Sequence, residues 1–267
     1  MKLPRTIRQI GKRVVKASPF LRRNIMTSSD YRVLSGRDEA RQLMRTSGGW
    51  LAARTVARQE RAYRGLIADM KRGRPRIDFE VAAKAIAATG IERPRVIEIG
   101  CGTGSYSEVL AGLLSGAIDY RGVDYSEAMI ARARAHHPGR QFDVGDATRL
   151  PYGDRSFDVA FNGVALMHIV DYEAAIQEAA RVAERYCILH GVPVFHDHTT
   201  IFLTKLAYGA PVVEVIFDKR ELLSICNEAG LLLEAEWPGI PYDMHEVTGH
   251  RSVSQTYLFA VKREPRQ

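Results

Sequence analysis

The sequence predicts an α/β fold built on a doubly wound, mostly parallel sheet, and three observations support that prediction. From residue 95 to residue 191, short apolar runs alternate with longer helical patterns, which is typical of a parallel sheet with helices on both faces. The glycine-rich stretch "VIEIGCGTGSYS" (96–107) makes a turn from the first strand to the first helix. No helical pattern separates the last two strands, so that pair can run antiparallel.

The elements of the sheet region follow in order along the chain. The predicted strands are "RVIEIG" (95–100), "AIDYRGVDY" (117–125), "QFDVGD" (141–146), "FDVAFNG" (157–163), "YCILHG" (186–191), "LLLEAEW" (231–237) and "SQTYLFAVKR" (254–263). The predicted helices are 105–116, 126–137, 171–184 and 218–230. Ser126 is expected to be an N-cap, because its hydroxyl can accept a hydrogen bond from a free amide of the first turn.

The residues that precede the sheet are predicted to form a helical extension. Residues 1–37 comprise a basic amphipathic helix over 3–17 and an irregular linker from residue 18. The helix can lie on an anionic membrane surface, or it can pack on its own domain with a solvated basic face.

Two further regions complete the domain organisation. Residues 38–90 show helical patterns over 38–71, interrupted by "SGG" at 47–49, and over 77–90. Residues 91–267 form the sheet domain, in which the segment 191–217 is an insertion rich in apolar and aromatic residues. We expect the N-terminal helices and this insertion to cover a ligand site at the carboxyl ends of the strands, on the side where a second substrate would enter.

Composition limits the class of protein. The net charge of +7 is uneven, because residues 1–76 contain 20 lysines and arginines against 5 acids and the remainder is net negative. The three cysteines are widely spaced and lack a CxxC pair, which favours a reducing compartment and argues against a disulfide frame or a cysteine zinc site. No apolar run reaches the roughly 20 residues of a membrane-spanning helix. We expect a cytoplasmic enzyme, with peripheral membrane contact through residues 3–17 as an open alternative.

The glycine loop indicates a nucleoside-containing cofactor. Its GxGxG spacing differs from the GxGxxG fingerprint of dinucleotide sites. Glu98, inside the first strand, would repel a pyrophosphate but suits a cofactor with a positive charge. Asp124 ends the second strand, where an acid can accept hydrogen bonds from ribose hydroxyls. Asp146 ends the third strand and could reach an adenine amino group.

Over residues 94–263 the stretches "VIEIGCGTGSYS", "GVDYSEAMIARAR" and "VGDATRLPYGDRSFDVAFNGVALMHI" resemble the class I S-adenosylmethionine-dependent methyltransferases. The resemblance implies a seven-stranded sheet whose last strand is antiparallel, with S-adenosyl-L-methionine as the cofactor. It also implies a set of cofactor-binding residues: Glu98, Gly100, Cys101, Gly102 and Gly104 at the methionine end, Asp124 at the ribose, Tyr125, Met129, Asp146 and Ala147 at the adenine, and Asn162 beside the acceptor.

The expected reaction is methyl transfer to a small-molecule or lipid-linked acceptor, with a hydroxyl oxygen favoured. A hydroxyl needs a base, and His168 and His190 are the candidates because each lies at or near a strand end on the ligand side. His196 and His198 form an HxH pair without a third spaced ligand, so no metal is expected.

Other functions remain open at this level. A nucleic-acid methyltransferase would use the basic N-terminal part, but the stretch from Asn162 lacks the paired prolines of enzymes that methylate base amines. The GxGxG spacing and the carboxylate of Glu98 argue against a nicotinamide oxidoreductase. A non-catalytic subunit with this fold is disfavoured, because suitable residues are present at all of the cofactor-binding positions.

Overall fold

The computed structural model describes residues 28–262. The strands are β1 (Ser28–Val33), β2 (Arg95–Ile99), β3 (Asp119–Asp124), β4 (Gln141–Val144), β5 (Phe157–Gly163), β6 (Ala183–Phe195), β7 (Ile201–Ala207), β8 (Ala210–Asp218), β9 (Leu231–Pro238) and β10 (Ser252–Val261). The helices are α3 (Arg37–Ser47), α4 (Ala53–Lys71), α5 (Ile77–Ala88), α6 (Ser105–Leu113), α7 (Glu127–His136), α8 (Tyr172–Val182), α9 (Lys219–Glu228) and α10 (His245–Thr248), with 3₁₀ turns η1 (Gly49–Leu51) and η2 (Leu166–His168). The predicted basic helix over 3–17 lies outside the described residues.

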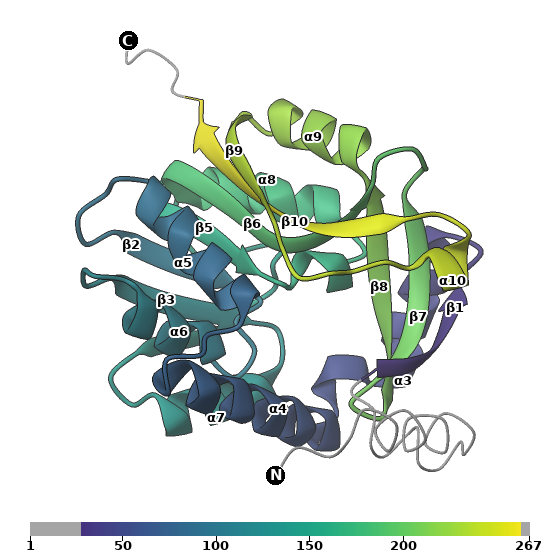
Figure 1. Cartoon of the computed structure of the whole chain (residues 1–267), viewed down its shortest axis with the longest axis horizontal. Coiled ribbons are helices and arrows are strands. Elements are labelled where there is room, and N and C mark those ends of the chain that lie inside the picture. The colour runs from purple at the N-terminus through teal and green to yellow at the C-terminus, as the bar shows by residue number, and fades with distance from the viewer. Residues whose placement is uncertain (1–27, 263–267) are drawn as a thin grey trace.

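Seven strands form the doubly wound sheet, in the order β9-β10-β6-β5-β2-β3-β4 (Figure 1). β2 pairs in parallel with β3 and β5, β3 with β4, and β5 with β6. β10 runs antiparallel to both of its neighbours, β6 and β9. The predicted fold class is therefore confirmed, including the antiparallel last strand.

The two faces of the sheet bury different sets of side chains, as the period of two along a strand requires. Val96 and Phe161 pack with α5 and α6 in one core. Ile97 and Ala160 point the other way and pack with α8 in the second core. Both cores contain completely buried aliphatic and aromatic residues, which fixes the register of the central strands and hence the position of the loops at their carboxyl ends.

The segment predicted as an insertion forms a second, antiparallel sheet. β7 and β8 make a hairpin, and β1 pairs with the outer edge of β7. Figure 1 shows these three strands standing beside the end of the main sheet. The end of β8 joins the end of β6 in parallel at Val194 and Phe195, so the two sheets are continuous.

Two boundary predictions were wrong. The predicted linker contains β1, because "SSDYRV" has the polar composition of a loop and becomes a strand only by pairing with β7, far along the sequence. The predicted fifth strand ended at Gly191, whereas β6 continues to Phe195. Gly191 has a φ of 70°, and β10 shifts register close by, so this glycine marks a local irregularity within the strand rather than its end.

The N-terminal helices are joined to the sheet domain through α7. The predicted interruption at 47–49 is confirmed, since α3 ends at Ser47, its C-cap Gly48 lies in the left-handed region and η1 follows. Glu60 of α4 is buried and binds Arg132 at 2.5 Å and His136 at 2.9 Å, both on α7. Among residues 28–262, no helix is long and apolar enough to cross a membrane.

Candidate cofactor and acceptor site

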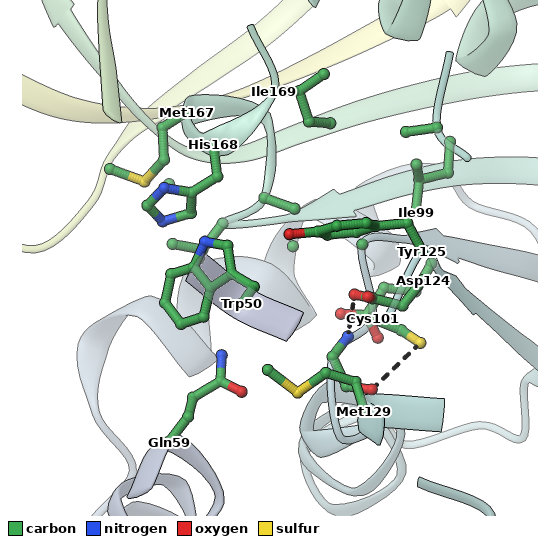
Figure 2. Close-up of a pocket in the computed structure, with 18 of the residues that line it drawn as sticks. Trp50, Gln59, Ile99, Cys101, Asp124, Tyr125, Met129, Met167, His168 and Ile169 are labelled. Carbon is green, nitrogen blue, oxygen red and sulfur yellow. Dashed lines mark hydrogen bonds between the residues drawn. The ribbon is translucent and has the colours of Figure 1, made fainter. Parts of the chain in front are cut away.

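A cavity of about 880 Å³ lies at the carboxyl ends of the parallel strands, which is where doubly wound sheets bind ligands. Its walls come from the glycine loop after β2, the ends of β3 and β4, the turn after β5, the middle of α4 (Gln59 and Tyr63) and the β7–β8 hairpin. Figure 2 shows the side chains of this cavity. All but one of the predicted cofactor residues and both candidate bases contribute to its walls or lie within the loop beneath it.

The glycine loop is shaped by backbone conformation and by close approach of the chain. Gly100, Gly102 and Gly104 have φ angles of 77°, 54° and 80°, a region that side chains with a Cβ rarely adopt. A Cβ at Gly100 would lie 2.3 Å from the Cβ of Ala165, so the loop presses against the turn after β5. Cys101 is buried in a small core with Phe142 and forms the floor of the loop. The loop can therefore approach a ligand with its backbone.

Asp124 connects the ends of two strands. Its Oδ2 accepts the Gly102 N–H at 2.9 Å, and its Oδ1 accepts the Ser126 N–H at 2.9 Å. Ser126 in turn caps α7 by accepting the Met129 N–H at 3.3 Å, as predicted from the sequence. Burial raises the pKa of Asp124 and these two N–H groups lower it, so the carboxylate is held by fixed donors at the cavity wall.

Glu98 lies beneath the loop with 1% of its surface exposed. Its carboxylate accepts a hydrogen bond from the Tyr120 hydroxyl. Burial raises the pKa of Glu98 well above its usual value, while the Tyr120 hydroxyl lowers it and the Asp124 charge raises it further. A cation in the cavity would favour the ionised form of both acids.

The residues predicted for the adenine end line the same cavity as Asp124. Met129 is buried, whereas Tyr125 is 43% exposed and its ring extends over the cavity in Figure 2. Asp146 and Ala147 also line this cavity. Asp146 Oδ1 accepts hydrogen bonds from the N–H and the hydroxyl of Thr148, both at 2.8 Å, which fixes the turn after β4.

The N-terminal extension adds two residues that sequence reasoning missed. Gln59 of α4 points toward the space between Trp50 and Met129 (Figure 2), and a Cβ on Gly102 would lie 3.6 Å from its Oε1. Gln59 Oε1 and Trp50 Nε1 are buried and have no hydrogen-bond partner among the described residues. The Trp50 carbonyl accepts the Ser126 hydroxyl at 3.3 Å. The extension therefore contacts the cofactor side as well as the acceptor side.

The turn after β5 is strained. Val164 has a φ of 61°, which is unusual for a β-branched residue and is typical of functional sites. Asn162 holds this turn, since its Oδ1 accepts the N–H groups of Ala165 at 3.2 Å and Leu166 at 2.7 Å. Asn162 lies within β5 and does not line the cavity, so it positions the turn that carries His168.

His168 is a neutral imidazole with a fixed tautomer. Its Nδ1 lies 2.7 Å from the carbonyl oxygen of Val213, which can only accept, so Nδ1 carries the proton and Nε2 keeps its lone pair. Burial, and next the charge of Lys205, lower the pKa of His168 to about 3. The ring centroid of Trp50 lies 5.0 Å away in an edge contact. His168 thus presents an unprotonated nitrogen within the cavity region.

His190 has a different environment. Its Nε2 lies 3.0 Å from the Tyr106 hydroxyl and its Nδ1 lies 2.8 Å from the Thr256 hydroxyl, so both ring nitrogens have partners. It is completely buried in the middle of β6, and burial lowers its pKa to about 4. Of the two candidate bases, only His168 has a ring nitrogen without a hydrogen-bond partner among residues 28–262.

The histidines after β6 lie elsewhere. The ring of His198 stacks on that of His250 with centroids 3.7 Å apart, and His196 is exposed. No group of three or more potential metal ligands occurs between residues 28 and 262.

Three comparisons with known proteins agree with this geometry. Residues 97–189 match the protein family described as "Methyltransferase domain". A demethylmenaquinone methyltransferase from Beutenbergia cavernae is 29% identical over 164 residues, which cover 55% of this chain and 67% of the relative. The O-methyltransferase cnsE from Penicillium expansum is 28% identical over 163 residues, which cover 58% of this chain and 57% of the relative. A solved S-adenosylmethionine-dependent methyltransferase from Methanosarcina mazei has a TM-score of 0.54 at 17% identity, covering 67% of this chain and 97% of that one.

The family match confirms the resemblance drawn from the sequence, and with it the enzyme class and S-adenosylmethionine as the cofactor. The residues present fit that cofactor. The bare loop at Gly102 leaves room for its amino-acid end, and the buried acids Glu98 and Asp124 suit its positive charge and its ribose hydroxyls. The unpartnered Gln59 Oε1 is an additional acceptor beside the loop.

Replacing Asp124 with alanine should weaken binding of S-adenosylhomocysteine by about 10- to 100-fold, because hydrogen bonds to a buried carboxylate are lost and the Gly102 and Ser126 amides lose their acceptor. Calorimetric titration measures the affinity, and circular dichroism checks the fold. Asp143→Ala is the matched control, because Asp143 lies on the neighbouring strand and outside the cavity lining. Equal affinity in the Asp124 variant and the wild type would contradict the assignment.

The two buried histidines should make the free energy of unfolding fall in acid. Their pKa values are lowered to about 3 and about 4, so below the ordinary value of about 6.5 the unfolded chain binds protons that the folded chain does not. Stability from each histidine is present above that value and is lost as pH falls toward the folded pKa, by about 1.4 kcal/mol per pH unit. Urea denaturation at a series of pH values should show a shallower slope for His168→Gln. His245→Gln, an exposed position in α10, should leave the slope unchanged; an unaltered slope in His168→Gln would refute the burial argument.

Proposed function

We propose that this chain, which carries a class I S-adenosylmethionine-dependent methyltransferase domain, methylates a hydroxyl oxygen of a small, largely apolar molecule. The observation that supports this most directly is the neutral His168, whose tautomer is fixed by Val213 and whose Nε2 is left with a free lone pair at the cavity. Transfer to a hydroxyl needs a base at that position, whereas transfer to an amine lone pair does not.

The chain contributes positioning, proton removal and exclusion of water. S-adenosylmethionine, when bound, supplies an electrophilic methyl group whose transfer to oxygen breaks the carbon–sulfur bond and leaves a neutral thioether. His168 Nε2 receives the proton of the acceptor hydroxyl. The strained turn at Val164 and the Asn162 hydrogen bonds hold that imidazole in place before the acceptor arrives. Fixed geometry of this kind is a large part of what such a reaction requires.

The walls around His168 favour a flat, apolar acceptor. Trp50 contacts His168, and the ring centroids of Trp50 and Tyr208 are 6.0 Å apart. Met167 and Ile169 flank the histidine and line the same cavity. Aromatic walls bind planar rings well, with offset or edge contacts adding to the burial of apolar surface. The Penicillium relative is named as an O-methyltransferase, which agrees with an oxygen acceptor.

The test is incubation of the purified protein with methyl-labelled S-adenosylmethionine and a cell extract, followed by separation of organic-soluble, nucleic-acid, protein and small aqueous fractions. The label should enter the organic fraction in a form that resists alkali, as a methyl ether does and a methyl ester does not. His168→Gln should lower the rate by about 10²- to 10⁴-fold, the usual contribution of a general base, while S-adenosylhomocysteine still binds.

His198→Gln is the control, since His198 stacks on His250 away from the cavity lining and its replacement should leave the rate unchanged. Label in nuclease-sensitive material would overturn the proposal in favour of a nucleic-acid acceptor. Full activity in His168→Gln would show that His168 is not the base.

A further inference from the structure

The β7–β8 hairpin carries a buried ion pair that opens onto the cavity. Lys205 lies opposite Val212, and Glu214 lies opposite Leu203, so all four side chains share one face of the hairpin. The Lys205 ammonium contacts the Glu214 carboxylate. Lys205 is 8% exposed and lines the cavity, whereas Glu214 is completely buried.

This pair is not explained by the stability of the hairpin. Burial of two charges is costly, and a well-packed apolar pair of similar volume is commonly as stable. The neighbouring side chains on this face, Leu203 and Ile216, are apolar and pack in a core with Phe195 and Met244. Neither carboxylate oxygen of Glu214 has a well-aligned hydrogen bond among the described residues. The hairpin therefore keeps a charge at a place where apolar packing surrounds it.

We propose that Lys205 binds the reacting oxygen of the acceptor as an anion, and that the acceptor is accordingly a phenol or an enol rather than an aliphatic alcohol. This inference rests on the proposed function, because it concerns the part of the cavity in which the acceptor would bind beside His168. Glu214 is a positioning residue that holds the ammonium toward the cavity, and the ring of Tyr31 lies 5.5 Å below Lys205 Nζ on the neighbouring strand.

The need for a cation follows from the nature of the base. His168 is buried, and the charge of Lys205 is near enough to lower its pKa further. A base that burial and a neighbouring ammonium weaken in this way is better matched to an acidic hydroxyl than to an aliphatic alcohol. A phenolic or enolic hydroxyl beside an ammonium is far more acidic, because the cation stabilises the resulting anion. The proton passes to His168 Nε2, the electron pair stays on the acceptor oxygen, and Lys205 retains its own protons.

The surroundings of Lys205 match this class of acceptor. The cavity beside it is lined by Ala207 and Tyr208 of the hairpin and by Ile240 and Tyr242 of the loop before α10. The Tyr242 hydroxyl is buried and has no hydrogen-bond partner among residues 28–262. Apolar and aromatic walls beside a buried ammonium and an unpartnered hydroxyl suit a flat ring that carries oxygen substituents.

The experiment uses 4-nitrophenol as the probe, since only its phenolate has a visible absorption band. The full chain, saturated with S-adenosylhomocysteine, is titrated with the probe at a pH below the probe's own pKa. The wild type should bind it and develop the phenolate band. The double variant Lys205→Met with Glu214→Gln, which leaves no unpaired buried charge, should bind about tenfold more weakly or worse and without the band. Lys205→Arg should keep the band.

The matched control is 4-nitroanisole, which cannot ionise and should bind the wild type and the double variant equally. Calorimetry with S-adenosylhomocysteine on each variant separates this inference from the proposed function. A variant that no longer binds the cofactor has a damaged fold or cofactor site, and its loss of probe binding would then not bear on Lys205. The inference is overturned if the probe does not bind, if it binds as the neutral phenol, or if the double variant binds it as the wild type does.

Discussion

The site depends on one carboxylate. Asp124 accepts one amide from the glycine loop and one from the start of α7, and so it fixes the ends of β2 and β3 relative to each other. Without that acceptor, two buried N–H groups would have no partner, which costs more than the hydrogen bonds themselves contribute. The same Ser126 that Asp124 holds binds the carbonyl of Trp50. A single side chain thereby links the glycine loop, the nucleoside side and the N-terminal cover.

The acceptor half is organised by strain and burial. Val164 adopts a conformation that costs free energy, and Asn162 holds the turn that contains it. The result is an imidazole with one nitrogen bound to the Val213 carbonyl of β8 and the other without a partner among the described residues. Lys205 lies on β7, the strand that pairs with β8 in the β7–β8 hairpin. The hairpin thus supplies both the anchor of the proposed base and the proposed anion-binding group.

Much of the fold and of the cofactor half could be predicted from the sequence, because local patterns determine them. The alternation of strands and helices, the loop glycines and the cap at Ser126 are all read within short windows. The strand β1 and the continuation of β6 could not be predicted, since both depend on pairing with distant residues. Trp50 and Gln59 were missed for the same reason: nothing near them in sequence shows that α4 docks on α7 through Glu60. Lys205 and Glu214 look like ordinary alternating strand residues until the hairpin register places them together.

The central claim is that the glycine loop and the N-terminal extension hold the cofactor jointly. Hydrogen–deuterium exchange, measured with and without S-adenosylhomocysteine, tests it most directly. We expect slower exchange on binding at residues 100–104, at residues 124–129 and, to a comparable degree, at residues 49–59. Protection that leaves the glycine loop unchanged, or that spares residues 49–59, would contradict it.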